Sequence, residues 1–582
     1  MKRLSQYLIF VGSQLKRSVE RFPETLSVTL LLVIMMIVRV HMDYDDPNDI
    51  YVEKILMALA ILMPITAGMK LAVERWSLDI LRRTALSAIA VVLAVVYYFI
   101  IPEQLNEYFM MRFIALFAML FIGFLVVPYC YNRNGLAQYI LYLYGRFFLT
   151  ALYAGVLFGG ISMMIFTVES LFNLNFNENI YFDLFIVLAG VFGVTFFLGS
   201  FPEIDEDVEL SSYSKIFKTL FLYIVLPIVS VYTVILYAYF VKILIEFELP
   251  QGLIGNLVLW YAIVSVLTLF FVRDLKDEVP WLERFMNIYI PLMIVPLLML
   301  YIAIGIRIDG YGITMPRYFV VSLALFATFS LAIMRIKKTD TSVPVTLMLI
   351  AFVGVSFFGV FSGYSVTLTD QNARLETMFV EYGLKNENGE FTARPDLDEQ
   401  KKNEVSNQIQ FLMRNYEMDE IKALPEDFNQ EKAASFLGFE LYGYWRGNNN
   451  MTYFNYYKEE ESVLIDVSNA DYMLMSSSYM KVQSLDIGSG ITVSKERDKP
   501  ELEFTSGGEV IAMIDLIESA KNFYLDQSEM PLYEFDLPDA GGKLVVSLNF
   551  KSINGHRGQV SNEDSSDLTI DFYELWIMMR IE

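Results

Sequence analysis

The sequence predicts a polytopic α-helical membrane protein of about eleven transmembrane helices, followed by a soluble α+β domain. Three observations lead to this fold class. Apolar residues make up 55% of the 582 positions and the mean hydropathy is +0.42, whereas ordinary soluble domains are less apolar. Long uncharged runs recur, and residues 219–241 are 23 positions without a charge, enough to cross a bilayer as a helix. The acidic surplus gathers in the last third of the chain.

Charge divides the chain near Gly363. Residues 1–363 hold 27 acidic and 25 basic side chains, whereas residues 364–582 hold 40 and 19, and the whole chain carries −23. This acidic segment excludes nucleic acid as a partner, because duplex binding needs clustered Lys and Arg. The one cysteine, Cys130, excludes disulfides and cysteine metal clusters within the chain.

Residues 1–25 read as a cytoplasmic amphipathic N-terminus. Their apolar side chains fall at helical spacing, and an amphipathic helix with basic residues favours the membrane surface. An ordinary solvated N-terminus is the alternative. The basic residues are Lys2, Arg3, Lys16, Arg17 and Arg21.

Residues 26–363 form the predicted transmembrane bundle. Helices are the economical structure for so many apolar runs, because a helix satisfies its own peptide groups in lipid. Each later run is near or above the length that a spanning helix needs, and the first is shorter. The eleven runs are 26–38, 55–73, 79–101, 110–131, 136–168, 180–201, 216–245, 253–272, 285–306, 317–334 and 345–363.

Basic residues predict the orientation of the bundle. About eighteen Lys and Arg lie on the connections of one side and six on those of the other, which favours a cytoplasmic N-terminus. An odd number of spans then places the tail outside the cell. One helix more or fewer would move the tail into the cytoplasm.

Polar and small residues within the spans favour packing over a pore. Arg146 and Asp183 lie near predicted span ends, where snorkelling or interfacial pairing explains them. Two strings of small residues, 154–160 and 188–199, predict close approach between helices.

Residues 364–582 read as a soluble acidic α+β domain on the outer face. Helical spacing predicts helices over 371–382, 397–416 and 510–524. β-Branched and aromatic residues between Gly, Asn and Asp turns predict strands. The strands expected are 440–445, 452–457, 462–467, 471–475, 490–494, 543–553 and 568–581.

The first outer loop holds the candidate catalytic or metal-binding side chains. Four carboxylates, Asp43, Asp45, Asp46 and Asp49, fall within seven residues, and carboxylate oxygens are ligands for divalent cations. Membrane glycosyltransferases with lipid-linked sugar donors also use an acidic first outer loop, which is an analogy of topology only. A solvated acidic loop is the plainer interpretation, so the metal remains undecided.

Common catalytic motifs are missing from the sequence. It contains no Walker sequence, no GxGxxG after a strand, no GxSxG elbow and no HExxH helix. ATPase, dehydrogenase, serine hydrolase and zincin functions therefore lack their minimum parts. No cofactor is expected, and a non-enzymatic protein is favoured.

Four stretches together resemble a known family. They are residues 21–32 (RFPETLSVTLLL), 236–252 (LYAYFVKILIEFELPQG), 306–320 (IRIDGYGITMPRYFV) and 361–376 (FSGYSVTLTDQNARLE). In this order and spacing they resemble the bacterial integral-membrane family that carries domain of unknown function 4153. The resemblance implies a bacterial plasma-membrane protein with many helices, and it supplies no activity and no catalytic residue.

The most specific part of that resemblance is the string from Tyr311 to Tyr318. At a helix start on the outer face, Gly312 permits a turn and Thr314 is placed to cap the next helix. Arg317 is expected to pair with Asp309 or with a lipid phosphate. The structural residues of this family motif are Tyr311, Gly312, Thr314, Arg317 and Tyr318.

Two functions from different classes remain open. The first is a non-enzymatic envelope sensor, scaffold or transporter-like protein whose partners are the lipid bilayer and, through the outer domain, an envelope protein or a wall polymer. The second is a metal-dependent lipid-linked glycosyl or phosphoryl transferase that uses the acidic first outer loop.

Overall fold

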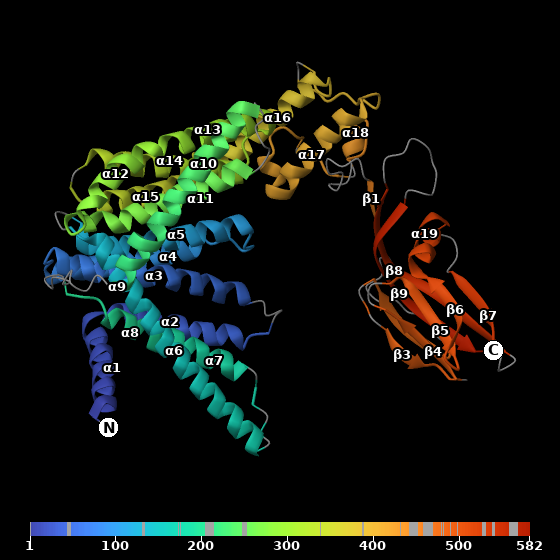
Figure 1. Cartoon of the computed structure of the whole chain (residues 1–582), viewed down its shortest axis with the longest axis horizontal. Helices are drawn as coiled ribbons and strands as arrows, with labels where there is room; N and C mark the ends of the chain where they lie inside the picture. The colour runs from blue at the N-terminus through green and yellow to red at the C-terminus, as the bar shows by residue number, and fades with distance from the viewer. Residues whose placement is uncertain are drawn as a thin grey trace. The chain divides into compact units, whose positions relative to one another are not determined.

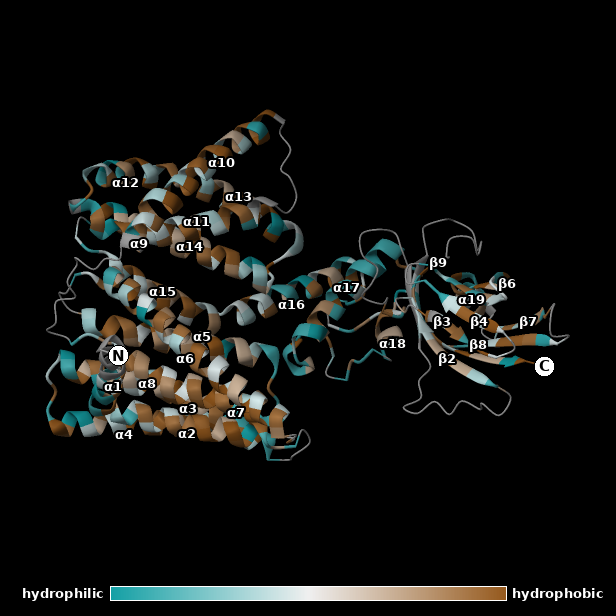
Figure 2. Cartoon of the chain, turned by 60° about the horizontal axis from the view of Figure 1, so that its bottom comes forward, coloured by the Kyte–Doolittle hydropathy of each residue, from teal (hydrophilic) through white to brown (hydrophobic). Residues whose placement is uncertain are grey.

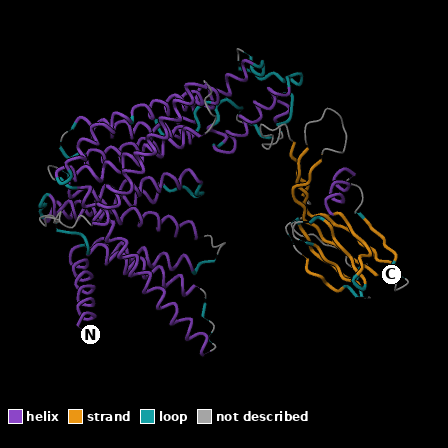
Figure 3. The backbone as a smooth tube through the Cα atoms, viewed as in Figure 1, coloured by secondary structure: helices purple, strands orange, loops and turns teal. Residues whose placement is uncertain are grey.

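A computed structural model gives the fold, and the chain divides into two compact units, Met1–Gln371 and Asn372–Glu582. Helices fill the first unit and strands dominate the second (Figure 3). The structure describes residues 2–43, 48–130, 134–172, 174, 176–177, 179–203, 215–246, 253–337, 339–386, 389–425, 427–430, 432–441, 452–457, 470–478, 480, 482–488, 490–496, 499–526, 531–537, 542–557 and 568–581.

The first unit is built from α-helices with short 3₁₀ and π-helical segments (Figure 1). Its elements are α1 (Lys2–Arg21), α2 (Pro23–Val40), α3 (Asp49–Arg75), α4 (Ile80–Ile100), α5 (Glu107–Val126), η1 (Val127–Tyr129), α6 (Leu136–Phe172), α7 (Asn179–Val187), η2 (Leu188–Gly193), α8 (Val194–Gly199), α9 (Lys215–Thr219), η4 (Leu220–Val225), α10 (Leu226–Glu246), α11 (Leu253–Val272), η5 (Arg273–Asp277), α12 (Pro280–Leu292), α13 (Ile294–Tyr311), α14 (Met315–Ile336), α15 (Ser342–Phe357) and α16 (Gly363–Glu381).

The predicted membrane bundle is confirmed. Within the described residues, ten helical stretches are long and apolar enough to cross a membrane, and α15 is a shorter apolar helix of 16 residues. These eleven match the eleven predicted runs one to one, and apolar residues dominate them (Figure 2). α7, η2 and α8 together form one stretch, as do α9, η4 and α10, and α12 with α13.

Two large apolar cores and a smaller one, around Leu62 and Ala94, lie within the described part of the bundle. The first joins α2, α3, α5, α6 and α8 around Phe22, Leu71 and Phe201. The second joins the helices from η4 to α15, and buried hydroxyls connect three of them. The Thr233 and Tyr261 hydroxyls lie 2.6 Å apart, and the Tyr289 hydroxyl donates to that of Tyr261 at 3.1 Å. Such bonds hold helices together in lipid, where packing has no hydrophobic drive.

The helices alternate in direction, so the bundle has two ends. At the end that holds Arg21, the Asp340 carboxylate before α15 accepts from the backbone N–H of Gly135 before α6 at 2.9 Å. At the opposite end, the Tyr318 hydroxyl at the start of α14 donates to the Phe361 carbonyl beyond α15 at 2.5 Å. α15 therefore returns the chain to the end opposite Arg21, and we call this the exit end.

Helix α1 runs across the direction of α3 and α5 (Figure 1). It packs against α8, where a Cβ on Gly199 would lie 2.2 Å from the Gln14 carbonyl oxygen. Only glycine allows this approach, because real Cβ atoms do not come so close. Gly190 serves α2 in the same way, since its Cβ would lie 2.3 Å from Val33. Close packing by the 188–199 string is confirmed at these two positions.

The second unit is an α+β domain with two antiparallel sheets. One sheet has the order β1–β8–β9–β2, with β7 also paired to β8, and the other has the order β3–β4–β5–β6. Its elements are α17 (Glu399–Asn415), η6 (Met418–Glu420), α18 (Ala433–Leu437), β1 (Thr452–Tyr457), β2 (Tyr472–Ser477), β3 (Val482–Asp486), β4 (Ile491–Lys495), β5 (Glu501–Ser506), β6 (Glu509–Asp515), α19 (Leu516–Asp526), β7 (Leu532–Asp536), β8 (Lys543–Arg557) and β9 (Leu568–Ile581).

One apolar core serves both sheets and α19. Along β8, Leu544, Val546 and Leu548 are fully buried at every second position, which is the period of a strand with one face inward. They cluster with Phe504 of the other sheet and Ala520 of α19. This shared core explains why the acidic segment folds as a domain.

The predicted helix 510–524 is wrong over its first six residues. Residues 510–515 belong to β6, where Ala512 pairs with Phe504 of β5, and the helix begins at Leu516. Strands β3, β5 and β7 were not predicted. The predicted strand 440–445 is described only at residues 440 and 441, which are not in a strand, and the predicted strand 462–467 lies outside the described residues.

Candidate functional site

The four predicted carboxylates of the first outer loop differ in their surroundings. Asp43 is exposed beyond the end of α2, and Asp45 and Asp46 lie outside the described residues. Asp49 is the first residue of α3, and its two carboxylate oxygens lie 2.6 and 2.7 Å from Arg39 nitrogens. Within the part of the chain that the structure describes, no group of three or more His, Cys, Asp or Glu side chains is arranged to hold a metal.

Arg39 contacts two carboxylates where α2 ends and α3 begins. Besides Asp49, its guanidinium lies 3.4 Å from Glu53. Nearby in sequence, His41 Nε2 lies 3.5 Å from an Asp183 oxygen, which is the interfacial pairing expected for Asp183. Both oxygens of the Asp49 carboxylate lie close to the Arg39 guanidinium, so a metal would have to compete with this charged pair. Asp49 therefore links the start of α3 to the end of α2 through Arg39.

The family motif stands at the exit end, where α13 gives way to α14. α13 ends at Tyr311 because Gly312 has φ 72° and ψ 179°, a backbone conformation that favours glycine. Thr314 occupies the N-cap position of α14, but the expected hydroxyl cap is wrong, because its side chain makes no capping bond. Pro316 removes one of the two backbone donors that such a cap uses, since it has no N–H at the second helical position.

Both backbone groups of Ile313, between these two helices, are bound by neighbouring side chains of α16. The Asp370 carboxylate accepts from the Ile313 N–H at 2.7 Å. The Gln371 amide donates to the Ile313 carbonyl at 2.8 Å, and Gln371 is 2% exposed. These bonds are partly shielded from water, where a backbone group without a partner is costly. Loop and helix are therefore fixed to each other.

Arg317 secures the other side of the same loop. Its guanidinium donates to the carbonyls of Tyr311 at 3.0 Å and Gly312 at 2.6 Å. It also stacks over the Tyr311 ring at 5.5 Å. A cation at carbonyls that close a helix is favourable, because the helix dipole is negative there. Pairing of Arg317 with Asp309 or a lipid phosphate stays a prediction.

Tyr318 joins α14 to the start of α16. Its hydroxyl binds the Phe361 carbonyl, and its ring would lie 2.8 Å from a Cβ on Gly363. Glycine at this position lets the first turn of α16 pack on the ring. We call Ile313, Tyr318, Phe361, Gly363, Asp370 and Gln371 the exit clamp.

Aromatic stacking links α5 to the exit clamp. The rings of Tyr108 and Tyr364 stack with centroids 3.9 Å apart. Arg112, one turn along α5, lies over the Tyr108 ring at 5.6 Å and over the Phe358 ring at 5.2 Å. The start of α5 is thus attached to the turn that leads into α16.

The exit clamp unites two of the four family stretches, 306–320 and 361–376. The sequence pointed to the first stretch as structural and gave no role to Asp370, Gln371 or Gly363 of the second. Their position in the family stretch 361–376 is the feature of the sequence that could have indicated a structural role for them. The clamp contains no nucleophile with an adjacent base, and its hydrogen bonds serve backbone groups. Its geometry suits mechanical connection rather than chemistry.

The family stretch at 21–32 lies at the opposite end. The Arg21 side chain is 9% exposed and its guanidinium lies 2.7 Å from Glu74 of α3. It also donates to the carbonyls of Phe201 at 2.6 Å and Pro202 at 3.0 Å. One buried arginine thus ties α1, α3 and the segment after α8 together.

Comparison with known proteins agrees with the resemblance. Residues 26–388 match the family described as domain of unknown function (DUF4153). An uncharacterized protein of Pasteurella multocida (strain Pm70) is 27% identical over 236 residues, which cover 40% of this chain and 40% of that protein. The chain thus spans less than half the length of this relative. No solved structure matches the chain.

Proposed function

Because the chain belongs to the family defined by domain of unknown function 4153, a family of membrane proteins whose description assigns no activity, we propose its function from its own contacts. It is a non-enzymatic sensor or scaffold of the bacterial cell envelope. Under this proposal the soluble domain lies outside the plasma membrane and binds a wall polymer or an envelope protein. Helix α16 then passes the state of that domain to the bundle.

The observation that carries this proposal is the role of three consecutive residues of α16. Asp370 and Gln371 bind Ile313 within the first unit. Asn372, the next residue, binds within the second unit, where its side chain accepts from the Ala423 N–H at 3.2 Å and donates to the Glu420 carbonyl at 3.3 Å. Contacts of both units thus fall on consecutive residues of α16, and this continuity of the chain is the basis of the proposed signal.

The acidic first outer loop supports the transferase alternative less well. Asp49 is bound by Arg39 through both carboxylate oxygens. A metal site there would have to displace a charge-assisted pair, which is among the stronger polar interactions in proteins. The sensor or scaffold is therefore the better-supported function.

Complementation of a deletion strain separates the two functions. The clamp variant combines Asp370→Asn with Gln371→Ala, and the loop variant combines Asp45→Asn with Asp46→Asn. We expect the loop variant to restore the deletion phenotype and the clamp variant to fail while reaching the wild-type amount in membranes. The reverse pattern would overturn the proposal and support the transferase. Immunoblots of membrane fractions supply the comparison of amounts.

A transporter is the more specific version of the non-enzymatic function. A thermal-shift screen of the full chain in nanodiscs tests it, because a specific ligand stabilises the folded state by mass action. Amino acids, monosaccharides and soluble wall fragments are suitable probes. Stabilisation by a wall fragment that disappears in the clamp variant supports sensing, and stabilisation that the clamp variant retains supports simple transport or binding.

A further inference from the structure

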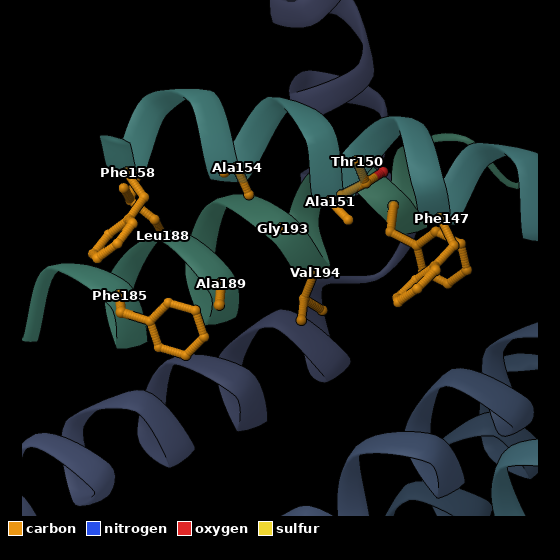
Figure 4. A pocket seen from close by; sticks show the side chains of 12 residues that line it. Phe147, Thr150, Ala151, Ala154, Phe158, Phe185, Leu188, Ala189, Gly193 and Val194 are labelled. Atoms are coloured by element: carbon orange, nitrogen blue, oxygen red, sulfur yellow. The ribbon is translucent and has the colours of Figure 1, made fainter. Parts of the chain in front are cut away.

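An apolar cavity of about 360 Å³ lies between α6 and the stretch α7–η2–α8 (Figure 4). Each wall has a phenylalanine at either end and smaller side chains between. The lining comprises Phe147, Thr150, Ala151, Ala154, Gly155 and Phe158 on α6, and Phe185, Leu188, Ala189, Gly193, Val194 and Phe197 on the opposite stretch. We call this cavity the tail slot.

Two phenylalanine pairs bridge the helices at the ends of the tail slot. The rings of Phe147 and Phe197 meet edge to face with centroids 6.0 Å apart, and those of Phe158 and Phe185 meet in the same way at 5.8 Å. These pairs act as spacers, and the small residues between them leave a channel. Phe147 and Phe158 are eleven residues apart on one helix, so the channel is about 16 Å long.

The small residues of α6 leave space instead of closing it. A Cβ on Gly155 would meet no atom within 4 Å, and the same holds for Gly159 and Gly160. The close packing expected from the 154–160 string is therefore wrong at these glycines. At Gly155 the phenylalanine pairs explain the difference, because their rings hold the helices apart, whereas Gly159 and Gly160 are exposed beyond the slot.

The walls of the tail slot favour hydrocarbon. Thr150 is the one hydroxyl among the lining residues, and it already donates to the Arg146 carbonyl at 2.8 Å. The slot lies between two stretches that are long and apolar enough to span a membrane, so the medium at its open side is the bilayer. The slot is open along its side, where Ala151 and Gly155 are exposed, and a narrow acyl chain fits between the two phenylalanine pairs more readily than a helix about 10 Å across.

A cation stands at one end of the tail slot. Arg146 directly precedes Phe147, and its guanidinium lies over the Tyr142 ring at 5.0 Å, one turn toward the start of α6. The Tyr142 hydroxyl donates to the carbonyl of Ser200, the residue after α8, at 3.4 Å. Arg146 is thus level with the end of a spanning stretch, where phospholipid headgroups lie.

From this juxtaposition we propose that the tail slot binds one acyl chain of an anionic glycerophospholipid, with Arg146 contacting its phosphate. The length of the slot equals about half of the ~30 Å hydrocarbon core. It therefore accommodates a tail of one leaflet, on the side of the membrane where Arg21 lies. Guanidinium groups bind phosphate oxygens through charge-assisted hydrogen bonds.

Photo-crosslinking tests the tail site. The full chain is placed in nanodiscs with phosphatidylglycerol that carries a diazirine in its acyl chain, and the adducts are mapped by mass spectrometry. We expect adducts at the slot residues, and a loss of about tenfold in Ala154→Phe, equivalent to about 1.4 kcal/mol of binding. Val156→Phe is the matched control, because Val156 is exposed on the same helix.

The outcomes distinguish a built site from general lipid contact. Adducts spread evenly over exposed Leu152, Val156 and Met163, and unchanged in Ala154→Phe, would overturn the tail slot. If Ala154→Phe fails to fold, Gly155→Leu replaces it, since a side chain there enters open space. Native mass spectrometry tests the headgroup, and Arg146→Gln should lose the preference for phosphatidylglycerol over phosphatidylethanolamine. A retained preference would overturn the role of Arg146.

Discussion

The Asp370 carboxylate accepts a 2.7 Å hydrogen bond from the backbone N–H of Ile313, 57 residues earlier in the chain. This bond joins the loop after α13 to the helix that leaves the bundle. Replacing Asp370 with Ala leaves a backbone donor without its partner. Because an unsatisfied buried donor costs about 1–3 kcal/mol, we expect the free energy of unfolding in lipid micelles to fall by that amount.

A matched control for Asp370 lies on the same helix. Glu381 is exposed at the end of α16, and Glu381→Ala should change the free energy of unfolding by less than about 0.5 kcal/mol. Equal stability of the Asp370→Ala and Glu381→Ala proteins would contradict the role given to the exit clamp.

The Tyr318 ring packs so close to Gly363 that no larger residue fits there without a shift. Because an added Cβ would lie 2.8 Å from that ring, we expect Gly363→Ala to destabilise the protein by about 1–3 kcal/mol through overpacking. Gly310→Ala, also in the bundle, should be tolerated because a Cβ there meets no atom within 4 Å. Thermal unfolding of both variants in nanodiscs measures the difference.

A double-mutant cycle identifies the cause of that loss. If the clash with Tyr318 is responsible, Gly363→Ala should cost much less in a Tyr318→Ala background, with a coupling of about 0.5–3 kcal/mol. Additive effects of the two substitutions would show that Gly363 matters for another reason.

The buried ion pair of Arg21 and Glu74 should be sensitive to loss of either partner. The Arg21 side chain is 9% exposed and that of Glu74 23%. We expect Glu74→Gln to cost about 1.5–3 kcal/mol, since it removes the charged partner of a guanidinium that keeps its two carbonyl acceptors. The pair Lys16 and Glu20 is 77% and 67% exposed, so Glu20→Gln should cost less than about 1 kcal/mol. Similar melting temperatures for the two variants would refute the tie at Arg21.

The hydrogen bond of Tyr382 predicts that the stability of the second unit falls at high pH. Its hydroxyl donates to Glu404 at 2.7 Å, and this bond to a carboxylate, with partial burial, raises the pKa of Tyr382 to about 12. Because the folded pKa lies above the ordinary value of 10.0, the stabilisation is complete below pH 10 and is lost as the pH rises toward 12. Tyr382→Phe should remove this component of the alkaline loss. An identical alkaline unfolding curve for the variant would contradict the pairing.

The membrane helices could be predicted from the sequence because their signal is local. Each span is an apolar run, and run length alone locates it. The prediction for the first residues of β6 was wrong because the deciding contact is not local. Val510, Ile511 and Met513 fit a helix or a strand equally well, and pairing with β5 through Phe504 decided the outcome. A partner strand leaves no mark in a local window.

The candidate site was predictable only in part. The turn at Gly312 could be predicted from the glycine itself, because a positive φ favours glycine. The partners of Ile313 lie on α16, and no spacing rule connects positions 313 and 370. The tail slot was hidden as well, because small residues predict close packing unless bulky rings such as Phe147 and Phe197 hold the helices apart.

An envelope sensor or scaffold requires the soluble domain to lie outside the plasma membrane, and cysteine labelling determines its side. With Cys130→Ser removing the single native cysteine, new cysteines are placed at exposed Gln400 in the second unit and at exposed Lys16 in α1. A maleimide that cannot cross membranes is then applied to cells with an intact plasma membrane. If the soluble domain lies outside the cell, we expect Gln400→Cys to be labelled before lysis and Lys16→Cys only after lysis. Protection of Gln400→Cys until lysis would contradict an envelope sensor or scaffold.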